Sequence, residues 1–326
     1  MPTLRRRLRL ARTAWLVLLP AMLLAACRPA SPPPGELPGA ASGPAGAVRQ
    51  LADHLQRNDL VAFARDAVPP AEHAQLVQAW AGGRSRWPLD ELPLDEQLGP
   101  LLTTLAVPGS EQELRRDFDR QLAGQDAALR DAARSLALFG TQYVKGQNGY
   151  SAEERAHYLQ ITAALGAWSA TAPLGDRDRG HAAIDRLTAA ARATGLEGGD
   201  MALAVAGMED SLRRLGPFAA ATKAVLADYG LDLDRSLADL RTGLIEEDGD
   251  RATVRIHYPL AGTEIDTVVS LTRRDGRWYL TDFLEHAAAL LAEPAPSPDP
   301  PEMPDAPGLP EPPPAIPAPA GPATGR

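Results

Sequence analysis

The chain has 326 residues, of which 44% are hydrophobic and 5% aromatic, with 42 acidic and 33 basic side chains. This composition excludes membrane-spanning and collagen-like proteins, and its many alanines favour packed helices over a broad β-sandwich. Twenty of the 31 prolines fall in residues 28–47 and 293–326, so the folded core is expected within residues 48–292.

The first 26 residues have the pattern of a secretory signal peptide. Five arginines and no acidic residue precede a thirteen-residue apolar run, 14–26, which is shorter than the roughly 20 residues of a spanning helix. The run ends in Leu24-Ala25-Ala26-Cys27, and Cys27 is the only cysteine. These four residues resemble the lipobox of bacterial lipoproteins; an ordinary secretory signal with an incidental cysteine is the alternative.

The resemblance implies that residues 1–26 are removed and that Cys27 carries acyl chains, which anchor the protein to a lipid bilayer. Arg28 rather than aspartate follows the cysteine, which by the same resemblance implies the periplasmic side of the outer membrane and leaves the inner membrane as the alternative. The signal peptide contains five basic and no acidic residues, so the mature chain has 28 basic and 42 acidic residues, a net charge of −14. This charge argues against nucleic acid as a partner.

After the lipidated cysteine, residues 27–47 are predicted to form a flexible Pro/Ala/Gly tether, and residues 48–235 a helical domain. The punctuation of Pro, Gly and capping residues predicts about seven to nine helices, with capping boxes starting at Ser110 and Ser151. Within residues 152–171 an apolar stripe recurs at helical spacing, which indicates either a core face or the lining of a ligand pocket. Its members are Tyr158, Ile161, Leu165 and Trp168.

Residues 236–292 change to short β-branched and aromatic runs, which predict a four-stranded antiparallel meander and a short closing helix packed on the helical domain. The expected strands are 242–246, 252–258, 263–272 and 277–283, and the expected helix is 284–292. The fold class is therefore α+β. The strings Arg-Arg-Asp-Gly-Arg-Trp-Tyr-Leu and Asp-Arg-Ala-Thr-Val-Arg-Ile make residues 252–283 resemble the terminal hairpins of nuclear-transport-factor-like lipoprotein domains.

Motifs of known chemistry are absent from the sequence: it has no His-Glu-x-x-His, no Gly-x-Ser-x-Gly, no phosphate-binding loop and no cysteine nucleophile. An acidic run at 176–180 superficially resembles a calcium loop but fits a helix N-terminus better. One face of the sheet brings together a base, a cation and two carboxylates, Arg255, His257, Glu264 and Asp266. These four form either an active site or a solvated face with cross-strand ion pairs.

The Pro-rich tail, 293–326, is predicted to be disordered. Its prolines at 298, 301, 304, 307, 310 and 313 form one ridge on a polyproline II helix, suited either to docking on an aromatic groove or to a spacer.

Together these features predict a lipid-anchored, non-enzymatic binding or assembly module of the cell envelope, without a cofactor, whose helical domain or tail contacts an envelope protein. The alternative is a carrier of small hydrophobic ligands with a cavity between sheet and helices; an enzyme comes third.

Overall fold

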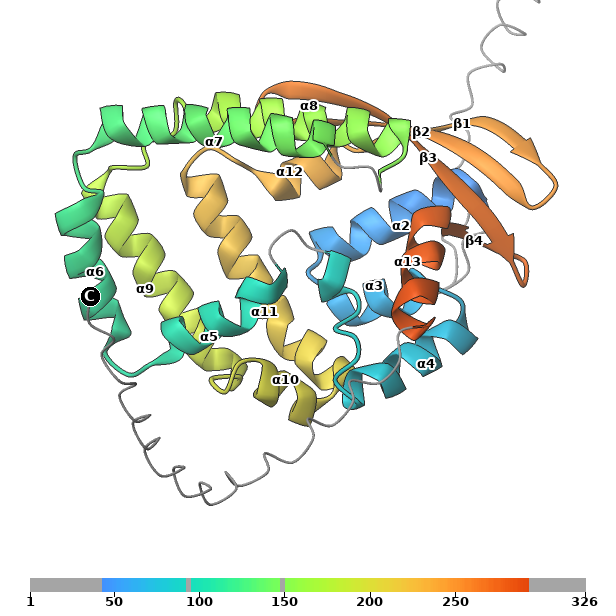
Figure 1. The fold of residues 1–326 in the computed structure, drawn as a ribbon, viewed down its shortest axis with the longest axis horizontal. Helices are drawn as coiled ribbons and strands as arrows, with labels where there is room; N and C mark the ends of the chain where they lie inside the picture. The colour runs from blue at the N-terminus through green and yellow to red at the C-terminus, as the bar shows by residue number, and fades with distance from the viewer. Residues whose placement is uncertain (1–42, 92–94, 147–149, 293–326) are drawn as a thin grey trace, which may run out of the picture.

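The computed structural model describes residues 43–91, 95–146 and 150–292 (Figure 1). This part of the chain has the predicted α+β fold, in which eleven α-helices precede a four-stranded antiparallel sheet and a closing helix. None of the described helices is both long and apolar enough to cross a membrane. The predicted signal peptide, Cys27 and the Pro-rich tail lie outside the described residues.

About seven to nine helices were predicted before the sheet, and the described residues contain eleven there, α2 to α12. The short helices α10 and α12 have seven and six residues, too few for an apolar period to reveal. The helices are α2 (Pro44–Gln56), α3 (Leu60–Asp66), α4 (Pro70–Ala81), α5 (Leu98–Ala106), α6 (Ser110–Gln121), α7 (Asp126–Gly146), α8 (Ala152–Ser169), α9 (Arg177–Thr194), α10 (Asp200–Ala206), α11 (Met208–Asp228), α12 (Leu233–Ala238) and α13 (Thr281–Ala292).

The boundary predicted between tether and helical domain is wrong by a few residues. Helix α2 begins at Pro44, where a proline is well suited to the first turn because it has no amide hydrogen to leave unpaired. Ala47, assigned to the tether, is buried with Val48 against the sheet. The described fold therefore includes the last residues of the proposed tether.

Of the two predicted capping boxes, the one at Ser151 is confirmed. Its hydroxyl accepts from the Glu154 amide at 3.0 Å, while the Glu154 carboxylate accepts from the Ser151 amide at 2.8 Å. The box at Ser110 is wrong, because Gly109 with a φ of 81° takes the capping position. Ser110 is already helical, and its hydroxyl donates to the Leu105 carbonyl at 2.9 Å.

The main helical core is built around two fully buried tryptophans, Trp80 and Trp87. Trp80 Nε1 donates to the Leu203 carbonyl at 2.9 Å, and Trp87 Nε1 donates to the Ala64 carbonyl at 3.3 Å. Both rings are thus buried without an unpaired N–H group, which lets their large apolar area stabilise the core.

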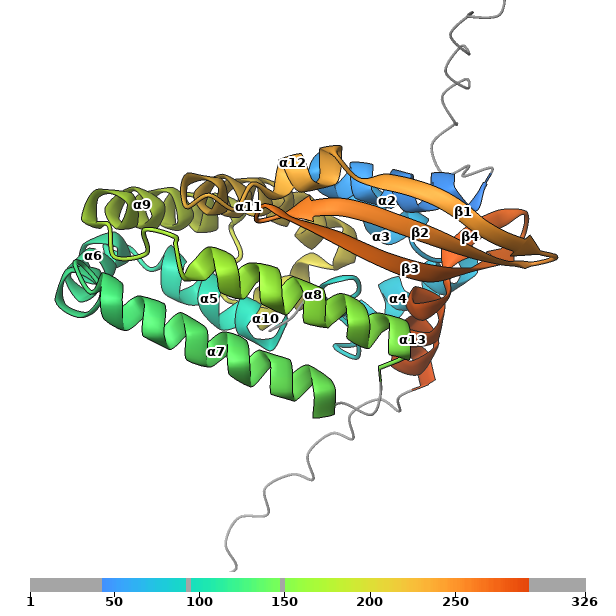
Figure 2. The ribbon, with the colours of Figure 1, turned by 90° about the horizontal axis from the view of Figure 1, so that it is seen from above.

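Helices α7 and α8 form an antiparallel pair along one side of the molecule, with α7 on the outside (Figure 2). They approach closely at Gly166, where an added Cβ would come 2.7 Å from the Ala137 Cβ. Three members of the predicted apolar stripe on α8 pack half-buried against the sheet, which confirms the core interpretation for Ile161, Leu165 and Trp168. The fourth, Tyr158, is 36% exposed at the rim.

The sheet has the order β1-β2-β3-β4, with strands β1 (Arg241–Asp248), β2 (Arg251–Leu260), β3 (Thr263–Arg274) and β4 (Arg277–Leu280). The predicted alternation is confirmed in β2, where Ala252, Val254 and Ile256 are buried in a cluster with α2. Asp275 and Gly276 have φ values of 52° and 75°, the left-handed pair that a tight hairpin turn requires.

The fourth strand is shorter than predicted, and the closing helix is correspondingly longer. Strand pairing ends at Leu280 opposite Leu271, and α13 begins at the next residue rather than at Leu284. Phe283, predicted in the strand, packs edge-on against Trp87 at 5.6 Å between ring centroids. The helical core therefore draws residues 281–283 away from the sheet.

The outer edge of β3 is closed by a side chain. Gln160 of α8 accepts from the Asp266 amide at 3.0 Å and donates to the Asp266 carbonyl at 2.7 Å, so its amide group substitutes for a neighbouring strand.

Candidate functional site

The predicted lipidation residue, Cys27, lies outside the described residues, and so does the Pro-rich tail. Within the described part, three surfaces bear on function: the polar face of the sheet, a hollow beside α2 and α3, and an exposed apolar face on α7.

The polar sheet face brings the four predicted residues together as strand pairing requires, with His257 directly opposite Asp266. Arg255 Nε lies 3.5 Å from an Asp266 carboxylate oxygen, and His257 Nδ1 lies 3.7 Å from Asp266 and 3.9 Å from Glu264. The sequence analysis missed a fifth member, Arg241 of β1, which pairs with Glu264. Its signal is the β1–β2 register, which places Arg241 opposite His257.

These five side chains stay in contact with water, since their exposed fractions run from 35% at His257 to 66% at Arg241. The basic side chains of β1 and β2 pair with the two carboxylates of β3. Exposed pairs of this kind contribute little to stability, because water screens them. The arrangement fits a solvated face with cross-strand ion pairs better than an active site.

The acidic run that resembles a calcium loop forms the start of α9, as predicted. Asp176 is the capping residue, and its carboxylate accepts from the Arg179 amide at 3.0 Å. Across the described ranges, no three His, Cys, Asp or Glu side chains are placed to hold a metal ion.

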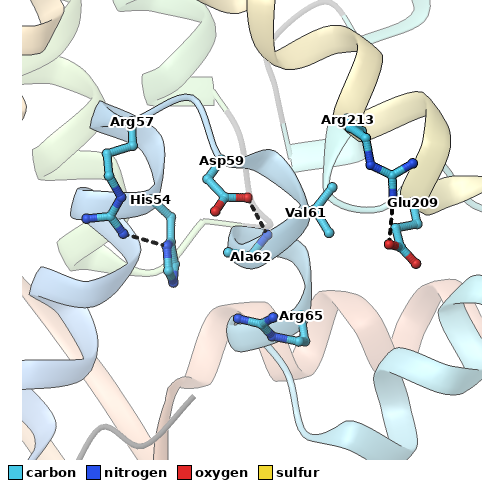
Figure 3. Close-up of a pocket in the computed structure, with 8 residues that line it drawn as sticks. All are labelled: His54, Arg57, Asp59, Val61, Ala62, Arg65, Glu209 and Arg213. Atoms are coloured by element: carbon cyan, nitrogen blue, oxygen red, sulfur yellow. Dashed lines mark hydrogen bonds and ion pairs between the residues drawn. The ribbon is translucent and has the colours of Figure 1, made fainter. Parts of the chain in front are cut away.

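A hollow of about 510 Å³ opens between α2, α3 and α11, and its wall is mostly charged (Figure 3). It is lined by His54, Arg57, Asp59, Val61, Ala62, Arg65, Glu209 and Arg213. Glu209 and Arg213, four residues apart on α11, form an ion pair at 2.7 Å. The Asp59 carboxylate accepts a hydrogen bond from the Ala62 amide at 2.9 Å and so caps α3. These charged groups are therefore already engaged with one another.

Behind this wall lies Asp66, whose carboxylate is almost fully buried. It accepts hydrogen bonds from Gln50 Nε2 at 3.0 Å, from His54 Nε2 at 2.9 Å and from Arg65 Nε at 2.9 Å. Burial acts to raise the pKa of Asp66, but the hydrogen bonds from His54 and Arg65 outweigh it and lower the pKa to about 2.

His54 is held at both ring nitrogens. Arg57 Nη2 donates to His54 Nδ1 at 3.1 Å, which puts the imidazole proton on Nε2, where it is donated to Asp66. Neither nitrogen is left to act as a base. This network fastens α2 to α3, and we interpret it as structural.

The third surface is an apolar face of α7 that the sequence analysis did not identify. Leu136, Phe139 and Tyr143 are 70%, 66% and 54% exposed and lie on one side of the helix. The Phe139 and Tyr143 rings stack with centroids 6.3 Å apart. The side that packs on α8 is separate and made of small residues such as Ala137 and Gly140. A helix with apolar residues on two sides signals a second contact.

No protein-family model matches the chain, and neither a curated protein nor a solved structure matches it. The resemblance of residues 252–283 to nuclear-transport-factor-like hairpins stays a prediction from sequence. Functional assignment therefore depends on the lipobox and on the surfaces described above.

Proposed function

We propose that the protein is a lipid-anchored, non-enzymatic binding or assembly module of the bacterial cell envelope, held on the periplasmic side of the outer membrane by acyl chains on Cys27. One observation carries the binding role, namely the exposed face of Leu136, Phe139 and Tyr143 on α7. An envelope protein with an apolar surface is the partner that this face fits.

The geometry of the polar groups supports a role without catalysis. On the sheet, Arg255 and Asp266 pair in contact with water, and beside α2 the two nitrogens of His54 are both occupied. Where the sheet meets the helices, Val254 and Ile265 are fully buried in apolar clusters. This packing favours the binding module over the carrier with a cavity at that boundary.

The anchor limits how far the folded body stands from the membrane. Sixteen residues separate Cys27 from Pro44, the first residue of α2. At roughly 3.5 Å per fully extended residue, this segment spans about 55 Å at most. Partners of the module are therefore proteins of the membrane or of the adjoining periplasm.

The anchor is tested by Cys27→Ser. We expect the variant to lose labelling by palmitate and to move from the membrane fraction to the soluble fraction, because no thiol remains for acylation. Arg28→Asp serves as the matched variant; it should keep the label and move from outer-membrane to inner-membrane fractions. Membrane retention of a processed Cys27→Ser protein would overturn the anchor.

The binding face is tested by photo-crosslinking in intact cells, with p-benzoyl-phenylalanine in place of Leu136. We expect one discrete adduct, which Phe139→Glu abolishes because a carboxylate disrupts an apolar contact. Leu138 is the control position, since it is 63% exposed but lies on another side of α7. Equal adducts at Leu136 and Leu138 would contradict a defined binding face.

A further inference from the structure

The apolar face of α7 has a natural occupant within the chain, the Pro-rich tail. We propose that residues 293–326 dock on the face of Leu136, Phe139 and Tyr143 in the free protein and compete there with the envelope partner. The competition rests on the proposed function, whereas the contact itself does not.

The tail has the chemistry of an amphipathic polyproline II helix, in which three residues make one turn. One column is the proline ridge, and the column that follows it carries the acids Asp299, Glu302, Asp305 and Glu311. The third column is apolar, with Pro300, Met303, Ala306, Leu309 and Pro312. Two neighbouring apolar columns therefore face a partner while the acidic column faces water.

The spacing of the tail matches the spacing of the face. Leu136 and Tyr143 are seven residues apart on α7, which corresponds to about 10.5 Å along the helix. One polyproline II turn advances about 9.3 Å, so two successive ridge prolines can lie over Leu136 and Tyr143, with Phe139 between them. The stacked rings of Phe139 and Tyr143 provide the aromatic surface on which proline rings pack in known recognition modes.

The tail follows Ala292, the last residue of α13. Figure 1 shows α13 beside α4 and running away from α7 and α8, so the tail must cross part of the molecule to reach the face.

Reach and affinity present no obstacle. The tail has 34 residues, which extend to roughly 105 Å at 3.1 Å per residue of polyproline II. A tether of this kind holds the tail near the face at a local concentration on the order of millimolar. Even a weak contact between a few proline rings and the face is therefore formed for much of the time.

The contact is tested in the purified full-length lipoprotein in detergent, with p-benzoyl-phenylalanine in place of Phe139. A mixture of ¹⁵N-labelled and unlabelled protein separates adducts within one chain from adducts between chains. We expect adducts within one chain, mapped by mass spectrometry to residues 298–313. Leu138 is again the control position, because its exposure of 63% matches the 66% of Phe139.

Three outcomes would overturn the contact: adducts mainly between chains, which would make a second copy the occupant; equal yields at the two positions; or no adduct to the tail. Period dependence is checked by changing Pro301, Pro304 and Pro307 together to serine, which should lower the yield several-fold. The same change at Pro296, Pro314 and Pro317, which fall in the phase of the acidic column, should leave the yield unchanged.

The competition is tested in cells by deleting residues 293–326, which should raise the partner adduct at Leu136 several-fold. An unchanged adduct would refute the competition. If the purified protein gives no contact within the chain while cells still give the partner adduct, the tail proposal fails and the proposed function stands. If the contact forms and no partner adduct appears in either form of the protein, the proposed function fails instead.

Discussion

Replacing Asp66 by asparagine tests the buried network that joins α2 to α3. The substitution keeps the size of the side chain but removes the charge that Gln50, His54 and Arg65 surround. An amide has a single acceptor oxygen, and its NH₂ group would face other donors. We therefore expect Asp66→Asn to lower the free energy of unfolding.

The magnitude follows from the pKa of Asp66, which falls from an ordinary value of 3.8 to about 2 in the folded protein. Each pKa unit corresponds to about 1.4 kcal/mol, so the ionised carboxylate stabilises the fold by about 2 kcal/mol at neutral pH. Because the folded pKa lies below the unfolded one, this contribution is complete above about pH 5 and is mostly lost as the pH falls to 2.

The assay is urea denaturation followed by far-UV circular dichroism at pH 7, 4 and 2.5. Asp66→Asn should lose about 2 kcal/mol at pH 7 and should lack the corresponding decrease of stability between pH 4 and 2.5. Asp131→Asn is the control, since this carboxylate is 74% exposed in its pair with Arg134 and should cost under about 0.5 kcal/mol. If Asp66→Asn costs no more than the control, the network does not stabilise the fold.

Trp278 is 4% exposed against α2, so Trp278→Ala should cost about 3 to 5 kcal/mol in denaturant melts, and Arg277→Ala little; a loss below about 1 kcal/mol at Trp278 would refute its core position. Gly166→Ala places a methyl group against Ala137 and should cost about 1 to 3 kcal/mol, whereas Gly146→Ala, which meets nothing within 4 Å, should cost nothing. Equal melting temperatures for the two glycine variants would contradict the close approach of α7 and α8.

The sheet was the part of the fold most open to prediction, because alternation in β2 and turn residues such as Asp275-Gly276 are local signals. The end of β4 could not be predicted, because no residue near Leu280 in the sequence indicates that strand pairing stops there. Phe283 has a strong strand propensity, and contacts with distant Trp87 override it.

The candidate sites also differ in how far the sequence alone predicts them. Pairing register brings His257 and Asp266 together, so their meeting was predictable from two strands and a turn. The exposed face of Phe139 and Tyr143 was not, because sequence shows which residues of a helix are apolar but not which side its neighbours cover. The role of Asp66 could not be predicted either, because it lies in no sequence motif and depends on how α2 and α3 pack.

The closing of the β3 edge by Gln160 has a consequence if the protein is anchored in a membrane as proposed. Copies confined to two dimensions collide often, and an open strand edge would let them add strand to strand into growing ribbons. With the Asp266 amide and carbonyl already paired, that site offers an incoming strand neither a donor nor an acceptor. Gln160 thus blocks the addition of another strand at Asp266.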